Sequence, residues 1–354
     1  MKRLRIFIGP VEIGKIGGTL ASAFREKEVK VTVVRNSVTP FQAGMKYNQT
    51  IQFECLNTVR RRFMKLKFFL KNFFRHDAFI FLFGKTLLSH NLDLPLYRLF
   101  HKKTLMWFLG SDIISYEAVE RAKRNEGLKD HHREPKKDNP QELLQKMNMI
   151  RKTEKYVDYI IADPTIAHLL TKNYIGIDHP SGIHMPIDIV NIRFNNETKP
   201  IPIIIHAPTD DEKKGTAFIV EALSKLEKEG YKFDFRLCKN MSNLQVREIL
   251  SEGDIAVDQL FSVAGGTFAV EAMAAGCVVL GGNIPRISGI YDLPILHTDS
   301  ANVYDNLKQV LEKPEMRKDL GAKGRIYAEK YHNHKKVAED ILNLFSQAKE
   351  KKSN

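Results

Sequence analysis

The sequence predicts an α/β protein with two doubly wound, Rossmann-like domains, each built on a parallel sheet. Three observations support this prediction. The chain has 354 residues, which is more than one ordinary hydrophobic core organises and suits two domains. Short apolar runs alternate with amphipathic helical patterns in both halves of the chain. Several runs end at glycine, lysine or acidic residues just before a helical pattern begins, and such sheets bind ligands at those ends.

The first half opens with a strand, a loop and a helix. Residues 4–8 form a short apolar strand, residues 9–18 a glycine-bearing loop and residues 19–27 an amphipathic helix. A strand over residues 29–34 follows. The charged segment 117–139 has few large apolar residues and predicts an exposed loop. Three other apolar runs are bounded by turn residues and suit buried parallel strands: 78–83, 104–109 and 159–162.

The second half repeats this alternation. Strands are expected over 202–207, 233–237 and 255–257, and helices over 216–229 and 246–252. A polar stretch near residues 188–202 suggests the boundary between the domains. We therefore expect a first domain at 1–187, a second at 188–334, and a C-terminal helical segment at 335–354 that returns to the first domain.

Cysteine and hydropathy patterns predict a location in the cytoplasm. The three cysteines are widely spaced and form neither a disulfide framework nor a zinc-binding pattern, which favours a reducing compartment. The apolar run near the N-terminus is too short for the core of a signal peptide. No apolar run approaches the roughly 20 residues of a membrane span.

The net charge of +13 is concentrated in the first half. Residues 1–185 contain 32 Lys and Arg against 18 Asp and Glu, whereas residues 186–354 contain 23 against 24. This asymmetry points to a polyanionic partner for one domain only, such as a membrane surface, a nucleic acid or an acidic substrate. The chain contains no recognised nucleic-acid-binding module, so nucleic acid is not expected as a partner.

A basic amphipathic helix is predicted over residues 60–75, with seven basic residues and no acid. Its apolar arc packs on the sheet in one interpretation. In the other, the helix docks on anionic lipid, because Met64 and Phe68 interrupt the basic face. We expect this domain to sit at the inner face of the membrane. The apolar arc comprises Phe63, Leu66, Phe69, Leu70, Phe73 and Phe74.

The glycine loop at residues 9–18 follows a strand and opens a helix, as phosphate-binding loops do. It does not spell a dinucleotide fingerprint, since Arg35 and Asn36 stand where an acid would bind the ribose. It also lacks the Lys-Ser/Thr ending of a P-loop. The glycines therefore indicate either the close approach of a ligand or only a tight turn.

Two junctions in the second half carry charged groups at strand ends. Lys214 stands beside a predicted helix N-terminus, and both features attract phosphate oxygens. Asp258 and Gln259 follow the strand at 255–257, where they either bind a base or sugar or cap the strand. The stretch Gly265–Gly276 then reads as a glycine turn and a short apolar helix with one carboxylate, Glu271. A buried carboxylate requires a partner, which predicts either a cation or ligand beside Glu271 or its exposure at the helix edge.

Taken together, these motifs resemble the GT-B glycosyltransferases, in particular the retaining, nucleotide-sugar-dependent family often called family 4. The resemblance covers nearly the whole chain, and the block from Phe268 to Gly276 is its most specific part. Weaker matches are Gly17-Gly18, Gly110-Ser111-Asp112, Met185-Pro186-Ile187-Asp188, Lys214-Gly215-Thr216 and Asp254 to Gln259.

The resemblance implies two GT-B domains with a cleft between them, a glycan or lipid-linked acceptor on the first and a UDP- or GDP-linked sugar on the second. It implies that Glu271 binds the donor ribose and Lys214 the diphosphate. Gly17 and Gly18, with Asp112, are expected near the donor phosphates and the acceptor. The implied reaction needs no cofactor and no metal, and the chain has no suitably placed Asp-x-Asp pair. The remaining expected donor-binding residues are Gly265, Gly266, Thr267, Asp258 and Gln259.

Three departures from the family pattern keep a second interpretation open. Val263 stands where a second glutamate is often found, and Leu109 where a histidine often precedes the Gly-Ser-Asp turn. The segment 207–209 lacks the arginine that usually accompanies the lysine. The preferred prediction is a retaining, metal-independent hexosyltransferase in cell-surface polysaccharide synthesis, and its catalytic residue is not identified. The alternative is a non-catalytic, nucleotide-binding GT-B relative.

Overall fold

The structure is a computed structural model that describes residues 4–39, 42, 45–125, 137–177, 181–197, 199–262, 265–284 and 292–347. The chain divides into two compact units. The first comprises Met1–Arg121, Lys136–Pro186 and His334–Asn354, and the second comprises Ala122–Pro135 and Ile187–Asn333. The division at Ile187 lies beside the boundary expected from the polar stretch.

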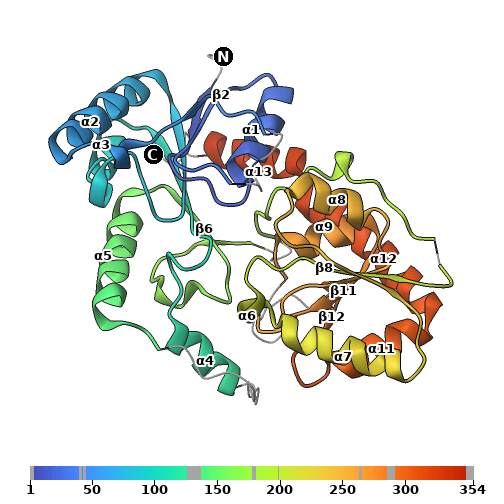
Figure 1. Cartoon of the computed structure of the whole chain (residues 1–354). Helices are drawn as coiled ribbons and strands as arrows, with labels where there is room; N and C mark the ends of the chain where they lie inside the picture. The colour runs from blue at the N-terminus through green and yellow to red at the C-terminus, as the bar shows by residue number, and fades with distance from the viewer. Residues whose placement is uncertain are drawn as a thin grey trace. The chain divides into compact units, whose positions relative to one another are not determined.

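The sheet of the first unit is entirely parallel and has seven strands among the described residues, in the order β3-β2-β1-β4-β5-β6-β7. Figure 1 labels β2 and β6, which lie on either side of the central strands. The order reverses direction between β1 and β4, which makes their carboxyl ends the topological switch point. The strands are β1 (Arg5–Ile8), β2 (Lys30–Arg35), β3 (Gln49–Thr50), β4 (Ala78–Leu82), β5 (Lys103–Trp107), β6 (Tyr159–Ala162) and β7 (Ile175–Gly176).

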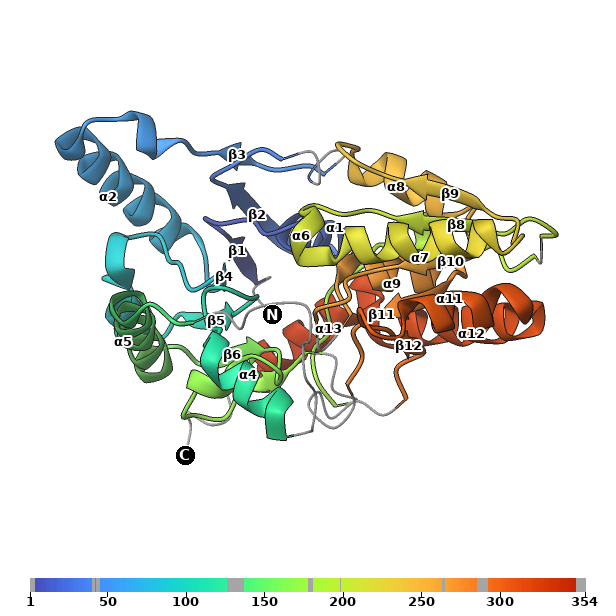
Figure 2. The same cartoon turned by 60° about the horizontal axis from the view of Figure 1, so that its bottom comes forward.

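Helices cover both faces of this sheet (Figure 2). On one face α1 (Ile16–Glu26) and α13 (His334–Gln347) pack together, and on the other lie α2 (Thr58–Arg75), α3 (Leu94–Leu99) and α5 (Pro140–Tyr156). Alternation along β1 sets these contacts, because Ile6 and Ile8 point to α1 and α13 while Phe7 points to the opposite face. A strand buried on both faces explains the continuous apolar runs in the sequence.

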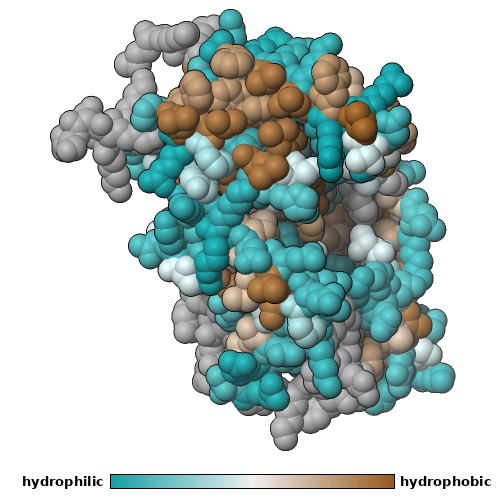
Figure 3. Space-filling view, turned by 90° about the vertical axis from the view of Figure 1, so that its left-hand side faces the viewer, coloured by the Kyte–Doolittle hydropathy of each residue, from teal (hydrophilic) through white to brown (hydrophobic). Residues whose placement is uncertain are grey.

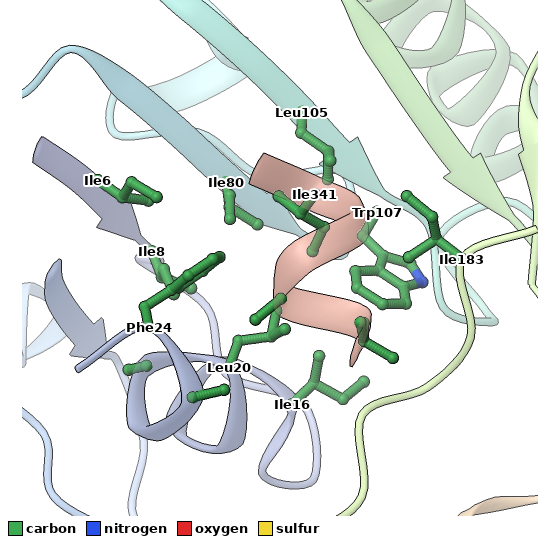
Figure 4. Close-up of a cluster of buried hydrophobic side chains, with 14 of the residues drawn as sticks. Ile6, Ile8, Ile16, Leu20, Phe24, Ile80, Leu105, Trp107, Ile183 and Ile341 are labelled. Atoms are coloured by element: carbon green, nitrogen blue, oxygen red, sulfur yellow. The ribbon is translucent and has the colours of Figure 1, made fainter. Parts of the chain in front are cut away.

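The C-terminal helix α13 is part of the first unit's core. Ile341 lies between α1 and the sheet, near Leu20 and Trp107 (Figure 4). Lys335 also forms an ion pair with Glu26 at the end of α1, with an N–O distance of 2.7 Å. Residues more than 300 positions apart in the sequence thus complete one hydrophobic core.

Helix α2 buries a narrower face than its apolar arc predicts. Phe69 and Phe73 are buried, whereas Phe63 and Phe74 are about two-thirds exposed, at 65% and 67%. The prediction was wrong for Phe68, which packs edge-on against Phe7 and Phe53 instead of lying on the basic face. The helix is therefore rotated relative to the sheet, so that part of its apolar arc faces solvent.

The second unit has a five-stranded parallel sheet among its described residues, in the order β12-β11-β10-β8-β9. Its switch point lies between β8 and β10, whose last residues, His206 and Val257, are paired in register. The strands are β8 (Ile203–His206), β9 (Asp234–Leu237), β10 (Ile255–Val257), β11 (Val278–Gly281) and β12 (Ile295–His297).

Helices also cover both faces of the second sheet. Helices α8 (Asn243–Leu250) and α9 (Thr267–Ala275) pack on one face, and α7 (Thr216–Lys228) and α11 (Val303–Glu312) on the other. The π-helical stretch Ala328–His332 follows α12 (Pro314–Tyr327) and leads to α13. Small residues make α9 compact enough to be buried almost all round, and this burial brings Glu271 inside the unit.

The sequence-based elements match the structure except at some ends. The first helix begins at Ile16 rather than at residue 19, so Gly17 and Gly18 lie inside its first turn. The expected exposed loop at 117–139 is wrong in its first part, because α4 (Tyr116–Asn125) is helical there. Residues 126–136 lie outside the described residues. No helix in the described part of the chain is both long and apolar enough to cross a membrane.

Candidate functional site

The carboxyl end of the second sheet brings together charged groups from two neighbouring strands. After β8 the chain forms the short helix α6 (Asp211–Lys214), whose N-terminus is capped by the Asp210 side chain. Gly215 then turns the chain with φ of 77°, a conformation that favours glycine. Since β10 ends next to β8, the residues that follow it lie beside this turn. The switch point of the second sheet is thus formed by Lys214 and Asp258.

Lys214 and Asp258 form an ion pair of 2.8 Å between Nζ and Oδ1. The Asp258 side chain is 2% exposed and that of Lys214 is 16% exposed, so solvent weakens this attraction little. The backbone holds the pair in place, because the Leu260 N–H donates to the Lys214 carbonyl at 3.2 Å. Asp258 is buried and needs a nearby cation to offset the loss of hydration of its carboxylate. The attraction between the two charges therefore holds the Lys214 ammonium group in place.

Asp258 also reaches the N-terminus of α9. Its Oδ2 accepts a hydrogen bond from the Gly266 N–H at 3.1 Å. No described side chain caps this helix, whose first N–H groups have no carbonyl partner within it. A lysine ammonium and a helix N-terminus therefore lie on either side of one carboxylate. Both favour an anionic ligand.

The other expected donor-binding residues lie around the same helix terminus. Thr267 is the first residue of α9. A Cβ atom added to Gly266 would lie 3.5 Å from Gln259 Nε2, so the Gln259 amide is adjacent to the turn. A Cβ on Gly265 would lie 2.6 Å from Ile295, which explains why that position is glycine. Val263 and Ala264 lie outside the described residues.

The sequence analysis did not identify His206, which connects the elements at the switch point through hydrogen bonds. It is buried, with Nδ1 2.7 Å from the Val257 carbonyl and Nε2 3.0 Å from Thr216 Oγ. Burial lowers the pKa of the imidazole. His206 thereby connects the end of β8 to the end of β10 and to α7, close in sequence to both residues of the ion pair. A histidine at the last position of an apolar strand was the signal in the sequence.

Glu271 is buried, at 2% exposure, and its carboxylate contacts groups of its own unit. Asn243 Nδ2 donates to both oxygens, at 3.2 and 2.9 Å, and Arg247 Nε lies 3.8 Å away. Arg247 in turn donates to the Asp188 carbonyl. The cation expected beside Glu271 is therefore the chain's own arginine.

In the first unit, the loop before α1 is filled by a carboxylate of the chain. Glu12 is buried and accepts hydrogen bonds from the N–H groups of Gly17 and Gly18, at 2.9 and 2.8 Å. Burial raises the pKa of Glu12, and these N–H groups act in the opposite direction. The group that closely approaches the two glycines is thus Glu12, in the place where the resemblance predicts a donor phosphate.

Asp112 orders the turn after β5. Its carboxylate accepts from the N–H groups of Leu109 and Gly110, at 3.1 and 2.8 Å. Burial raises its pKa to about 6, and the Lys146 ammonium has a smaller, opposite effect. Lys146 is fixed by donating to the Ile114 carbonyl at 2.5 Å. Asp112 therefore titrates closer to neutral pH than an ordinary aspartate.

The described residues contain no cluster of three or more His, Cys, Asp or Glu side chains that could hold a metal ion. No protein-family model matches the sequence, and no curated protein matches it either. Comparison with solved structures gives a different result, because the whole chain superposes on several of them.

Three solved structures illustrate this likeness. HepE from Anabaena, in complex with UDP-glucose, matches with a TM-score of 0.60 and 10% identity over 98% of this chain and 100% of its own. Sucrose-phosphate synthase from Thermosynechococcus elongatus matches with a TM-score of 0.63 and 14% identity over 98% and 99%. WaaG, a glycosyltransferase of lipopolysaccharide biosynthesis, matches with a TM-score of 0.57 and 16% identity over 96% and 99%. Together with the two parallel sheets, these likenesses show that the chain has the GT-B fold of glycosyltransferases.

Proposed function

We propose that this protein is a glycosyltransferase that takes a sugar from a UDP- or GDP-linked donor. The observation that carries the proposal is the Lys214–Asp258 ion pair beside the α9 N-terminus, at the switch point of the second sheet. Ligands of doubly wound sheets bind at such points. The fold supports the same function, since HepE, which has this fold, binds UDP-glucose.

The chemistry of this site suits a diphosphate leaving group. When the bond between the sugar and the diphosphate breaks, negative charge accumulates on the phosphate oxygens. Lys214 and the first N–H groups of α9 stabilise that charge from fixed positions, which costs little reorganisation. We propose that this stabilisation needs no metal ion, and that the transferred group is a hexose whose anomeric configuration is retained. We assign no catalytic base.

Within the same proposal, the remaining residues position the donor. Gly265, Gly266 and Thr267 form the turn that admits the phosphates, and Gln259 lies beside it. Glu271 reaches the ribose in this proposal only if its oxygens accept from ribose hydroxyls in addition to Asn243. A carboxylate has about four acceptor positions, so both interactions are compatible.

A non-catalytic, nucleotide-binding GT-B protein is the second candidate. One observation favours it: the Glu12 carboxylate occupies the N–H groups of Gly17 and Gly18. A donor phosphate would have to displace a buried carboxylate there. Leu109, in place of a histidine near Asp112, is consistent with the same candidate.

We also propose that the first unit docks on an anionic membrane surface, where its acceptor is a glycan or lipid-linked precursor of a cell-surface polysaccharide. Helix α2 carries a second apolar stripe at helical spacing, and all its members are exposed. Figure 3 shows hydrophobic residues gathered on this side of the first unit. Phe100, also exposed, extends this surface, since its ring lies 5.3 Å from that of Phe73. We call this surface the α2 stripe; it comprises Val59, Phe63, Leu66, Leu70, Phe74 and Phe100.

Basic residues accompany the α2 stripe. Arg60, Lys67 and Lys71 are exposed on the same helix, which contains no acidic residue. An apolar stripe with adjacent cations suits insertion into the headgroup region of an anionic bilayer. In this proposal the protein works at the cytoplasmic face of the membrane.

Vesicle sedimentation tests the membrane proposal. Phosphatidylglycerol vesicles should bind the protein more strongly than phosphatidylcholine vesicles, and a Phe63→Ser, Phe74→Ser double variant should lose most of this binding. Ile326→Ser is the matched control, because Ile326 is as exposed as Phe63 but lies in the second unit. Equal binding to both vesicle types would overturn the proposal.

Thermal shift with UDP, GDP and their sugar conjugates tests the donor proposal. A ligand that binds only the folded state stabilises it by about 2.7 kcal/mol at 100 times its Kd, which gives a readily measured shift. Release of nucleoside diphosphate from the responding conjugate then separates the two candidates. Stabilisation with turnover supports the enzyme, stabilisation without turnover supports the nucleotide-binding protein, and no response contradicts both.

A further inference from the structure

A cavity of about 800 Å³ lies at the switch point of the first unit. It is lined by Pro10 and Val11 after β1, by residues 84–91 after β4, and by side chains of α2 and α5. All its lining residues belong to the first unit. We propose that this cavity binds an anionic amphiphile, namely a phosphate ester with an apolar group, and that this ligand is the acceptor. The ligand's role as the acceptor rests on the proposed function, whereas its binding in the cavity does not.

The charge of the cavity is positive. Lys65, Lys85 and Lys152 line it, and none of the described lining residues is acidic. Lys152 donates to the His90 carbonyl at 2.8 Å. Lys65 and Lys85 form no hydrogen bond or ion pair with the residues that the structure describes. Two ammonium groups at the edge of a cavity that have no partner among the described residues favour an anion, and lysine binds phosphate as a point charge.

The remaining wall of the cavity is largely apolar. Phe68 presents its ring beside Lys65, one turn earlier on the same helix, and packs against Phe53 at a centroid distance of 5.8 Å. Met149 closes the opposite side from α5, against Gly84. Ligand cavities with an apolar wall and few charged groups bind molecules with both characters. The apolar lining comprises Ile51, Phe53, Phe68, Leu87, Leu88 and Met149.

Buried polar groups hold the loop after β4 in place. The Asp93 carboxylate, fully buried, accepts from Thr86 Oγ at 2.5 Å, from the Leu87 N–H at 3.0 Å and from Tyr97 Oη at 3.0 Å. Asn91 bonds to the Thr86 N–H and the Gly84 carbonyl.

The same loop also carries backbone strain. His90 and Asn91 have positive φ values of 54° and 53°, which are strained for residues other than glycine. The polar network of Asp93 and Asn91 therefore fixes a strained loop along one wall of the cavity. Strained backbone that is held by buried polar groups is typical of ligand-binding sites.

Isothermal titration with three probes tests the proposal on the full chain: dodecyl phosphate below its micelle concentration, inorganic phosphate and dodecyl maltoside. Dodecyl phosphate should bind at one site, with at least tenfold higher affinity than either other probe. Lys65→Gln and Lys85→Gln should each weaken it about tenfold, the loss expected when a hydrogen bond to a charged group is removed. Lys30→Gln, which changes an exposed lysine at the start of β2 outside the cavity, should leave the affinity unchanged.

Three results would overturn the proposal: equal affinity for inorganic phosphate, equal affinity for dodecyl maltoside, or an equal loss in Lys30→Gln. Binding that disappears in the Phe63→Ser, Phe74→Ser variant but survives in Lys85→Gln would move the site to the α2 stripe and also overturn it. Failure of the proposed function looks different. In that case dodecyl phosphate would bind with the expected lysine dependence, while no nucleotide sugar would be turned over.

Discussion

The two sheets of this protein carry different chemistry at equivalent places. At the switch point of the second sheet, Lys214 is paired with a buried aspartate beside a helix N-terminus that no described side chain caps. At the switch point of the first, Lys65 and Lys85 face a large cavity, and the neighbouring helix N-terminus is filled by Glu12. In the proposed function, the second unit binds the diphosphate beside Lys214, and the open, basic and apolar cavity of the first unit takes the acceptor.

The largest expected effect concerns the buried carboxylate of the second unit. Glu271→Ala leaves Arg247 buried without its carboxylate and should lower the free energy of unfolding by about 3–5 kcal/mol. Urea denaturation measures this loss. Glu221→Ala, an exposed glutamate on α7, is the control and should change stability by less than about 0.5 kcal/mol. Unchanged stability in Glu271→Ala would mean that the internal partners of Glu271 are unimportant.

Removal of Lys214 should affect turnover more than folding. Lys214→Met, combined with Asp258→Asn so that no buried charge is left unpaired, should reduce kcat by roughly 10²–10³-fold. Assays of nucleoside diphosphate release measure this effect. Lys213→Met is the neighbouring control, because the Lys213 side chain is 61% exposed and pairs with Asp210. Equal losses in the two lysine variants would remove Lys214 from the donor site.

Asp112 should make the stability of the first unit depend on pH. Its pKa is raised from 3.8 to about 6, so the folded state binds a proton more tightly than the unfolded state. The free energy of unfolding should therefore fall as pH rises from about 4 to 6, by up to about 3 kcal/mol. Asp112→Asn removes this dependence, and its stability relative to the wild type should increase over the same range.

Urea denaturation at pH 4 and pH 7 measures this difference. Asp319→Asn, which changes an exposed carboxylate on α12, should show a nearly constant offset from the wild type. A constant offset for Asp112→Asn as well would show that Asp112 titrates like an exposed aspartate.

The smallest expected effects are the losses of stability on replacing a glycine at a helix N-terminus by alanine, once in each unit. A Cβ on Gly18 would lie 2.8 Å from Tyr47 Oη and 3.1 Å from Met45 Cβ, so Gly18→Ala should cost roughly 1–3 kcal/mol of stability. A Cβ on Gly266 meets no atom of the described residues closer than 3.5 Å. Gly266→Ala should therefore cost less in thermal melts, but should weaken nucleotide binding. If Gly266→Ala lost more stability than Gly18→Ala, the loop before α1, and not the turn before α9, would have room for a ligand.

The sequence predicted most of the fold because the central strands of both sheets are continuous apolar runs with helical patterns between them. It also pointed to Lys214 and Asp258, since residues at the ends of neighbouring parallel strands meet at one edge. It did not reveal that Glu12 fills the first glycine loop, because that contact depends on the path of the loop. Partial burial of Phe68 and exposure of Phe63 depend on the rotation of α2 about its axis, which helical periodicity leaves open. The cavity after β4 was missed for a similar reason, because its loop is shaped by the buried Asp93.

Hydrogen exchange with and without UDP-glucose would show whether the nucleotide binds at the switch point of the second sheet. We expect slower exchange of backbone amides in residues 207–216 and 265–275, and unchanged exchange in residues 84–91 of the first unit. Protection confined to residues 9–18 or 84–91, with no change around Lys214 and α9, would contradict this expectation.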